Sequence, residues 1–224
     1  MKLISLLVLL IIVYLYFNKS NKKVKKIPKL HKKIYYGLEI IDKIFNKHNI
    51  YYTIAYGTLL GAVRHWNIIE WDDDADIHIL KKDVNKILKL KDEFKKHGLI
   101  LEQNWKLLKI YFDKSKYPFI DLFVIEDNKG KTLRCKTKTK SCSSMKAKWW
   151  SKWYNFPYQW LSNRKKLKFG HLKLWAPKES IKILKFWYGK KCLKECYTSN
   201  YNHITGKFMK PKKVICQNLP VPQK

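Results

Sequence analysis

Acidic residues are scarce in this chain of 224 residues, which has 17 Asp and Glu against 48 Lys and Arg and a formal net charge of +31. Arginine is scarce too, since it occupies only positions 64, 134 and 164. Nucleic-acid binders depend on arginine, whose planar guanidinium binds phosphates and base edges better than the lysine ammonium does. A lysine excess with abundant Asn, Ile and Tyr also matches an A/T-rich coding sequence. We therefore do not expect nucleic acid as the partner.

Cysteines are few and their spacing is not that of a metal site. The five positions are Cys135, Cys142, Cys192, Cys196 and Cys216, an odd number for a simple disulfide framework. Neither nearby pair has zinc-ribbon spacing, and no histidine pair completes a tetrahedral ligand set. The sequence leaves two interpretations equally open, unpaired thiols or one or two local disulfides.

Long hydrophobic runs are missing except at residues 3–17. As a helix these fifteen residues would extend about 22 Å, less than the roughly 30 Å of a bilayer core. No small-x-small cleavage site follows, which disfavours a removed signal peptide. We expect residues 1–18 to be an uncleaved signal anchor of a single-pass membrane protein, followed by a basic linker over 19–32. The lysines after the run favour a cytosolic location for the rest of the chain.

The remaining chain has the composition of one folded domain. Its hydrophobic fraction of 46% excludes wholesale disorder, and 224 residues suffice for one core. Strand-like and helix-like segments alternate, which predicts an α/β (α+β) fold with a mixed β-sheet flanked by helices over 33–210, and a flexible tail over 211–224. The predicted helices are 34–48, 59–65, 81–98, 144–156 and 178–189, and the predicted strands are 51–56, 75–80, 107–112, 118–126 and 170–176.

Much of the little negative charge lies in one run, WDDDADIHI at residues 71–79. If this run enters a strand, Asp72, Asp74 and Asp76 project to the same side, because side chains alternate along a strand. Carboxylates two residues apart can share one divalent cation such as Mg²⁺. Asp121 is a candidate third carboxylate, because it is the one charged residue within the apolar run PFIDLFVI. The competing interpretation is an acidic loop or helix cap and an ordinary strand-end aspartate.

The segment before this run, AYGTLLGAVRH, is typical of a phosphate-binding turn. Gly57 permits close approach of the backbone, and Thr58 is placed to cap the helix that follows. A helix N-terminus offers free N–H groups to a phosphate. Arg64 is a permanent cation able to bind a phosphate through two hydrogen bonds, and His65 is a candidate phosphate contact or acid–base residue, although a lone histidine is more often a surface residue.

The stretch YGTLLGAVRHWNIIEWDDDADIHI, residues 56–79, resembles the signature of the LicD/fukutin family, which belongs to the nucleotidyltransferase-fold superfamily. The resemblance implies a Gly57-Thr58 turn, a metal-binding pair Asp74 and Asp76, and a third carboxylate at Asp121. Asp72 belongs to the same acidic run and is a candidate member of the site. A weaker similarity continues through Arg164 and the YG at 188–189.

The resemblance implies an activity. Family members transfer a phosphorylated alcohol, such as phosphocholine, ribitol phosphate or glycerol phosphate, from a CDP-activated donor to a glycan hydroxyl. By this analogy Mg²⁺ or Mn²⁺ would bind Asp74, Asp76 and Asp121, while Arg64 and Arg164 would hold phosphate oxygens. Asp121 or Asp72 would take the hydroxyl proton. The family resemblance favours the secretory pathway, against the cytosolic location that the lysine distribution favours.

Two alternatives remain at this stage. The same carboxylates could serve nucleotidyl transfer from an NTP to RNA or another acceptor, although the expected membrane anchor disfavours it. A non-enzymatic basic protein tethered to the membrane would explain the lysines but not the spaced aspartates. The aromatic stretch at 149–160 is interpreted as core and surface packing, with an acceptor-sugar platform as the less favoured hypothesis.

Overall fold

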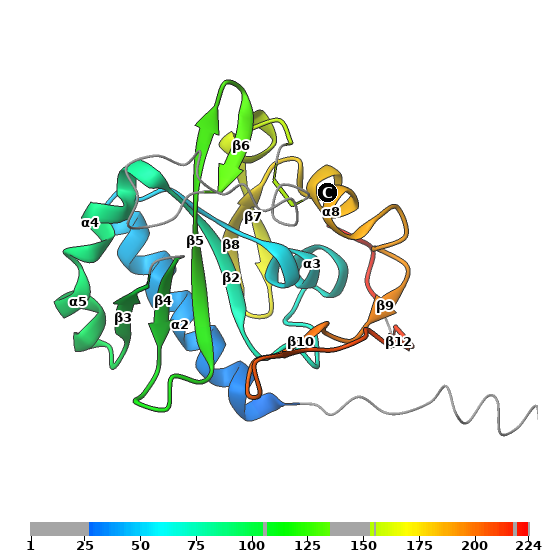
Figure 1. Cartoon of the computed structure of the whole chain (residues 1–224), viewed down its shortest axis with the longest axis horizontal. Helices are drawn as coiled ribbons and strands as arrows, with labels where there is room; N and C mark the ends of the chain where they lie inside the picture. The colour runs from blue at the N-terminus through cyan, green and yellow to red at the C-terminus, as the bar shows by residue number, and fades with distance from the viewer. Residues whose placement is uncertain (1–26, 105–106, 135–152, 155, 217–218, 224) are drawn as a thin grey trace, which may run out of the picture.

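A six-stranded mixed β-sheet organises the molecule, and its strand order is β1-β2-β5-β4-β3 with β6 paired to β5 (Figure 1). The computed structural model describes residues 27–104, 107–134, 153–154, 156–216 and 219–223. The strands are β1 (Tyr52–Ile54), β2 (Ala75–Leu80), β3 (Ile100–Gln103), β4 (Leu108–Tyr111), β5 (Phe119–Asn128) and β6 (Lys131–Arg134). The prediction of a mixed α/β sheet is confirmed.

The central strands β2 and β5 run parallel, and every other pairing in this sheet is antiparallel. The parallel register places Asp76 opposite Asp121, and the antiparallel register of β4 and β5 places Lys109 opposite Asp121. Residues opposite one another in neighbouring strands share a face of the sheet. One face of the sheet therefore carries a row of three charged side chains across three strands.

The other face of the sheet is apolar and is covered by α2 (Pro28–Lys47). This helix begins with a proline in its first turn, a position where the missing N–H costs nothing. Its apolar residues recur at helical spacing and are buried. They are Ile34, Leu38, Ile40, Ile41, Ile44 and Phe45. Because α2 already starts at Pro28, the folded domain begins before residue 33, within the expected linker.

The predicted helix over 81–98 is three short pieces rather than one. These are η1 (Lys81–Asp83), α4 (Val84–Leu88) and α5 (Lys91–Lys96), with turns at Lys89 and Leu90. The predicted end at Gly98 is confirmed, because this residue has a φ of 70° that glycine adopts without strain.

The face that carries the charged row is covered by α3 (Tyr56–His65) and α8 (Ser180–Tyr188), which also contact each other. Beside them lie α7 (Gln159–Ser162) and the hairpin β7 (Arg164–Phe169) and β8 (Leu172–Pro177), which packs on β1. The sequence predicted β8 but not its partner β7, whose alternating lysines hide the strand pattern. The predicted helix over 144–156 lies mostly outside the described residues.

The C-terminal part of the chain is more ordered than its composition suggests. Four two-residue strands form two small ladders: β9 (Cys196–Tyr197) with β12 (Lys213–Val214), and β10 (Tyr201–Asn202) with β11 (Lys207–Phe208). Farther on, the side chain of Gln223 donates to the carbonyls of Ala62 (2.7 Å) and Lys168 (2.9 Å). Within the described part of 211–224, residues 213–214 thus pair with β9 and Gln223 contacts α3 and β7, which differs from the expectation of a flexible tail.

The sequence left open unpaired thiols or one or two local disulfides, and the described residues contain one free thiol and one disulfide of longer range. Cys196 forms a disulfide with Cys216, 20 residues away, and Cys192 is a buried free thiol. Burial raises the pKa of the Cys192 thiol. Cys135 and Cys142 lie outside the described residues. Long-range pairing of this kind is decided by the fold and has no signature in cysteine spacing.

The expectation of a single-pass membrane protein requires correction. Within the described residues, no helix combines the length and the apolar character needed to cross a bilayer. The segment that the sequence proposed as an anchor, 1–18, and the first part of the expected linker lie outside those residues.

Candidate active site

The start of α3 is fastened to the beginning of β2. Thr58 does not cap its helix as expected, because its Oγ1 instead accepts a hydrogen bond of 2.8 Å from the Asp76 N–H. The N–H of Ala55 donates to the carbonyl oxygen of Asp76 at 2.9 Å. These two bonds fix the backbone of Asp76 from both sides. The turn between β1 and α3 therefore lies directly against the acidic run.

Three carboxylates converge in this place, as the sequence predicted. Asp74, Asp76 and Asp121 each offer an oxygen, and these oxygens all lie within 4.8 Å of one another. Asp74 immediately precedes β2, and the parallel register aligns Asp76 with Asp121. The Nζ of Lys109 forms an ion pair with Asp121, and it lies 3.5 Å from the centroid of the Phe119 ring. No sequence pattern distinguishes Lys109 from the many other lysines.

Burial and mutual repulsion disfavour the charged form of these carboxylates. Burial raises the pKa of Asp74 to about 7, with the Asp121 charge acting in the same direction. The pKa of Asp76 is also well above its ordinary value, because of burial and then because of Asp74 and Asp121. Acidic side chains placed this closely are stabilised by a cation between them.

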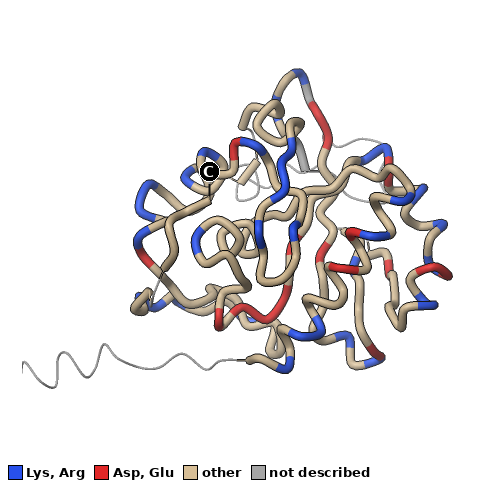
Figure 2. The backbone as a smooth tube through the Cα atoms, turned by 180° about the vertical axis from the view of Figure 1, so that it is seen from behind, with Lys and Arg blue, Asp and Glu red and all other residues tan. Residues whose placement is uncertain are grey.

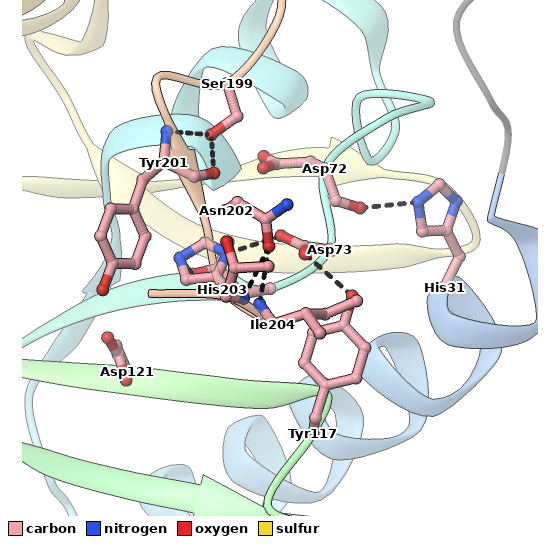
Figure 3. Close-up of polar contacts among 12 residues, drawn as sticks. His31, Asp72, Asp73, Tyr117, Asp121, Ser199, Tyr201, Asn202, His203 and Ile204 are labelled. Carbon is pink, nitrogen blue, oxygen red and sulfur yellow. Dashed lines mark hydrogen bonds and ion pairs between the residues drawn. The ribbon is translucent and has the colours of Figure 1, made fainter. Parts of the chain in front are cut away.

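Asp72 lies at the edge of this group, beside Gly57. A Cβ at residue 57 would come within 2.6 Å of the Asp72 Oδ2, so glycine leaves the space that this carboxylate occupies. The backbone carbonyl of Asp72 accepts a hydrogen bond of 2.9 Å from His31 of α2 (Figure 3). Burial, and then the charges of Asp74 and Asp73, raise the pKa of Asp72 well above its ordinary value.

Asp73 has two partners of its own, and one of its oxygens, an Asp74 oxygen and a ring nitrogen of His203 lie within 4.8 Å of one another. Tyr117 donates to its Oδ2 at 2.8 Å, and His203 Nδ1 lies 2.7 Å from its Oδ1 (Figure 3). The other ring nitrogen of His203 lies 3.2 Å from Asp74 Oδ2. Burial lowers the pKa of His203, but the hydrogen bond to Asp73 and the neighbouring aspartates outweigh it and raise the pKa to about 9. Nothing in the sequence around His203 indicated this contact.

The predicted phosphate-binding cations are placed differently from expectation. Arg64 lines the same cleft, but its Nη1 donates to the carbonyls of Cys192 and Glu195, both at 2.8 Å. Burial lowers the pKa of Arg64 to about 10. Arg164 lies elsewhere: its guanidinium carbon is 4.6 Å from the Tyr51 ring centroid and 4.5 Å from that of Trp175. The structure does not bring Arg164 to the carboxylates.

His65, the other predicted phosphate contact or acid–base residue, is not among the described residues that line the cleft. Burial, and then the Arg64 charge, lower the pKa of His65 to about 4, so its ring is neutral at pH 7. Its ring meets Trp71 edge to face, with the centroids 6.5 Å apart. In the aromatic stretch 149–160, the rings of Tyr154 and Phe156 are buried in the core, as the packing interpretation predicts.

A cleft of about 1160 Å³ opens over the carboxylates. One wall is formed by the start of α3, the acidic run and β5. The cleft is also lined by residues after α8, between Lys191 and Pro211. Along the described backbone, Lys and Arg positions are spread over many elements rather than confined to one segment (Figure 2). The cleft leaves the carboxylates accessible to a ligand.

Fold and site together define a nucleotidyltransferase-type domain: a mixed sheet carries a D-x-D pair and a third aspartate on the adjacent parallel strand, beside the N-terminus of a helix. The family described as LicD/FKTN/FKRP, nucleotidyltransferase domain, matches residues 49–179, which is more than half of the chain. The chain belongs to this family.

Individual relatives match shorter segments. An uncharacterised protein of Rickettsia typhi is 37% identical over 89 residues, which is 40% of this chain and 27% of that protein. The lipopolysaccharide cholinephosphotransferase LicD of Haemophilus influenzae is 31% identical over 51 residues, 23% of this chain and 19% of that enzyme. The chain thus spans less than a third of either relative.

Among solved structures, the lincomycin-bound lincosamide antibiotic adenylyltransferase LnuA is similar with a TM-score of 0.41 and 14% identity. The similarity covers 66% of this chain and 82% of LnuA.

Proposed function

We propose that this protein is a metal-dependent transferase that moves a phosphorylated alcohol from a CDP-activated donor to a glycan hydroxyl. The group would be of the phosphocholine, ribitol phosphate or glycerol phosphate type. The observation that carries the proposal is the convergence of Asp74, Asp76 and Asp121 within 4.8 Å. Family membership and the similarity to a cholinephosphotransferase support the class of group transferred.

The carboxylates fit a hard divalent cation. All three candidate ligands are carboxylate oxygens, which Mg²⁺ and Mn²⁺ prefer. Their burial leaves them short of solvent, and their mutual repulsion favours a cation among them. When bound, Mg²⁺ or Mn²⁺ would neutralise the charge that develops on the phosphates as CMP departs. Asp74, Asp76 and Asp121 would hold the ion.

The start of α3 has two roles in this scheme. Its first N–H groups face the acidic run and can hold a phosphate oxygen of the donor. Thr58 fixes the backbone of Asp76, so that the metal-binding carboxylate keeps its direction. Gly57 leaves room for Asp72.

Asp72 is the residue that we assign to the acceptor proton. It lines the cleft beside Gly57 but lies outside the set of three converging carboxylates. Asp121, the other candidate, is ion-paired with Lys109 and is a proposed metal ligand. A carboxylate that binds no metal is the better proton acceptor, because metal coordination withdraws its electron density. Asp72 would therefore take the proton of the attacking glycan hydroxyl.

The test is release of CMP from a panel of CDP-alcohols. The full chain would be incubated with Mn²⁺ or Mg²⁺ and with CDP-choline, CDP-ribitol or CDP-glycerol, and CMP measured by mass spectrometry with and without a mixed glycan acceptor. We expect release from one donor, its loss with EDTA, and its loss in Asp76→Asn. The matched control is Asp92→Asn, the same change at an exposed position in α5.

An NTP panel run in parallel distinguishes the alternative reaction. Release of pyrophosphate from an NTP, with no CMP from any CDP-alcohol, would replace the proposed donor by a nucleotide triphosphate. Activity that persists in Asp76→Asn would place the chemistry outside the three carboxylates and contradict the proposal.

A further inference from the structure

Two of the arginines already have partners inside the protein. Arg64 lines the cleft but its Nη1 is engaged with two backbone carbonyls, and Arg164 lies between Tyr51 and Trp175. Phosphate oxygens are bound most strongly by charged donors. The lysines of the cleft are therefore the next candidates for contact with the phosphates.

Three lysines line the cleft among the residues that the structure describes: Lys109, Lys191 and Lys210. Lys109 is already paired with Asp121. Lys191 has a loose ion pair with Glu195, at 4.0 Å and with its side chain 80% exposed. Lys210 is exposed and lines the same cleft as the aspartates. Lys191 and Lys210 are thus the cleft lysines that remain available to a ligand.

Lys210 belongs to a segment with a defined shape, which we call the closed loop, residues 196–216. The disulfide between Cys196 and Cys216 joins its ends. The β9/β12 and β10/β11 ladders tie its two arms together along their length. Between the ladders, the Met209 N–H donates to the Asn200 carbonyl at 2.8 Å. The position of Lys210 is therefore set by covalent and hydrogen-bonded structure on both sides.

The closed loop is also fastened to the acidic wall of the cleft. His203 contacts Asp73 (Figure 3) and also Asp74, and Trp71 Nε1 donates to the Tyr197 carbonyl at 3.1 Å. One of these contacts is made by a side chain of the loop, His203, and the other by a side chain of the acidic run, Trp71. The loop and the aspartates consequently form two walls of one cleft with contrasting charge.

We propose that the closed loop is the phosphate-binding wall of this active site, and that Lys210, together with Lys191 before the loop, binds the phosphate groups of the donor. An anionic ligand between the walls would meet a metal held by aspartates on one side and two ammonium groups on the other. The identity of the donor as a CDP-alcohol rests on the proposed function, whereas the phosphate contact does not.

The test compares two double variants of equal charge change in the full chain. Lys191→Ala/Lys210→Ala removes the cleft lysines, while Lys190→Ala/Lys212→Ala removes their exposed neighbours, which do not line the described cleft. Calorimetry would measure binding of pyrophosphate and of CDP, each with Mn²⁺. We expect about tenfold weaker binding of both probes in the first variant, a loss typical of charged hydrogen bonds, and little change in the second.

The disulfide offers an independent check, because Cys196→Ser/Cys216→Ser should weaken pyrophosphate binding without changing the affinity for Mn²⁺ alone. If that variant does not fold, the comparison of the two lysine double variants still tests the proposal. Equal losses in the two lysine variants would overturn the inference, as would no loss in either. Pyrophosphate binding in the wild type without turnover of any CDP-alcohol would contradict the proposed function alone, and no binding of either probe would contradict both.

Discussion

Gly57 and Asp72 lie so close together that the Cβ of any other residue at position 57 would come within 2.6 Å of the Asp72 Oδ2. The two residues belong to different structural elements, the first turn of α3 and the acidic run before β2. Their contact joins the two halves of the sequence signature into one site. Gly61, the second glycine of α3, differs in this respect, because a Cβ there would meet a backbone oxygen and not the Asp72 side chain.

Gly57→Ala should lower activity more than stability. The new methyl group meets the end of a side chain, so Asp72 can move away, and the proton-accepting carboxylate is then misplaced. We expect turnover to fall about tenfold or more, as for misplaced catalytic groups, with a nearly unchanged melting temperature. Gly61→Ala is the control, because its Cβ would meet the backbone oxygen of Asn67 at 2.6 Å. That variant should lose about 1–3 kcal/mol of stability. If Gly57→Ala and Gly61→Ala lost activity and stability in the same proportion, the proposed difference between the roles of the two glycines would be contradicted.

Thr58→Val should weaken the junction between α3 and β2. The buried N–H of Asp76 would lose its acceptor, which costs about 1–3 kcal/mol when no water replaces it. Urea unfolding of the metal-free protein would measure the change. Thr58→Ser keeps the hydroxyl and should retain most of the stability, apart from the lost methyl group. A serine variant as unstable as the valine variant would show that packing of the methyl group dominates.

In EDTA, Asp74 should make a contribution to folding stability that is lost as pH rises from about 4 to about 7. Asp74 has a pKa of about 7 in the folded state and an ordinary value of 3.8, so the folded state holds a proton that the unfolded state has released. Stability falls with pH wherever the folded state binds more protons. Thermal melts at several pH values would show the slope, which should be shallower in Asp74→Asn. Added Mn²⁺ should restore stability at pH 7, and a metal-independent melt there would contradict the cation site.

Arg164→Ala should affect stability and leave phosphate binding unchanged. The guanidinium stacks between Tyr51 and Trp175 and donates to the Tyr52 carbonyl at 3.2 Å. Removing it should cost about 1–3 kcal/mol, from the stacking and the hydrogen bond together. Calorimetry with CDP and Mn²⁺ should give the wild-type affinity. A clear loss of affinity in a stable variant would restore the assignment made from the sequence.

The convergence of carboxylates could be predicted from the sequence because it depends on local pattern. Side chains alternate along a strand, so Asp74 and Asp76 share a face wherever that strand lies. Asp121 stood out as a lone charge in an apolar run, and the fold then placed it opposite Asp76. Signals of this kind need only the strand period and a contrast with their neighbours.

The contacts that were not predicted connect segments distant in sequence. His203 reaches Asp73 across 130 positions, and the disulfide partner of Cys196 is 20 residues away rather than at Cys192. Lysine is so common in this chain that neither Lys109 nor Lys210 could be singled out. Arg64 and Arg164 were singled out for their rarity, but the structure uses them in packing and in hydrogen bonds to carbonyls. Rarity of a residue type did not distinguish a ligand contact from an internal one.

Because β2 and β5 pair in a fixed parallel register, the site depends on whether the number of residues inserted within a strand is even or odd. The loops between Leu80 and Phe119 lie outside these two strands, so a loop there could lengthen without separating Asp76 from Asp121. One residue inserted between Phe119 and Asp121 would instead turn the aspartate toward α2, and a second insertion would return it to the cleft. The site thus tolerates loops of different length in its longest connection, as long as β4 keeps Lys109 opposite Asp121, but only change in steps of two within β5.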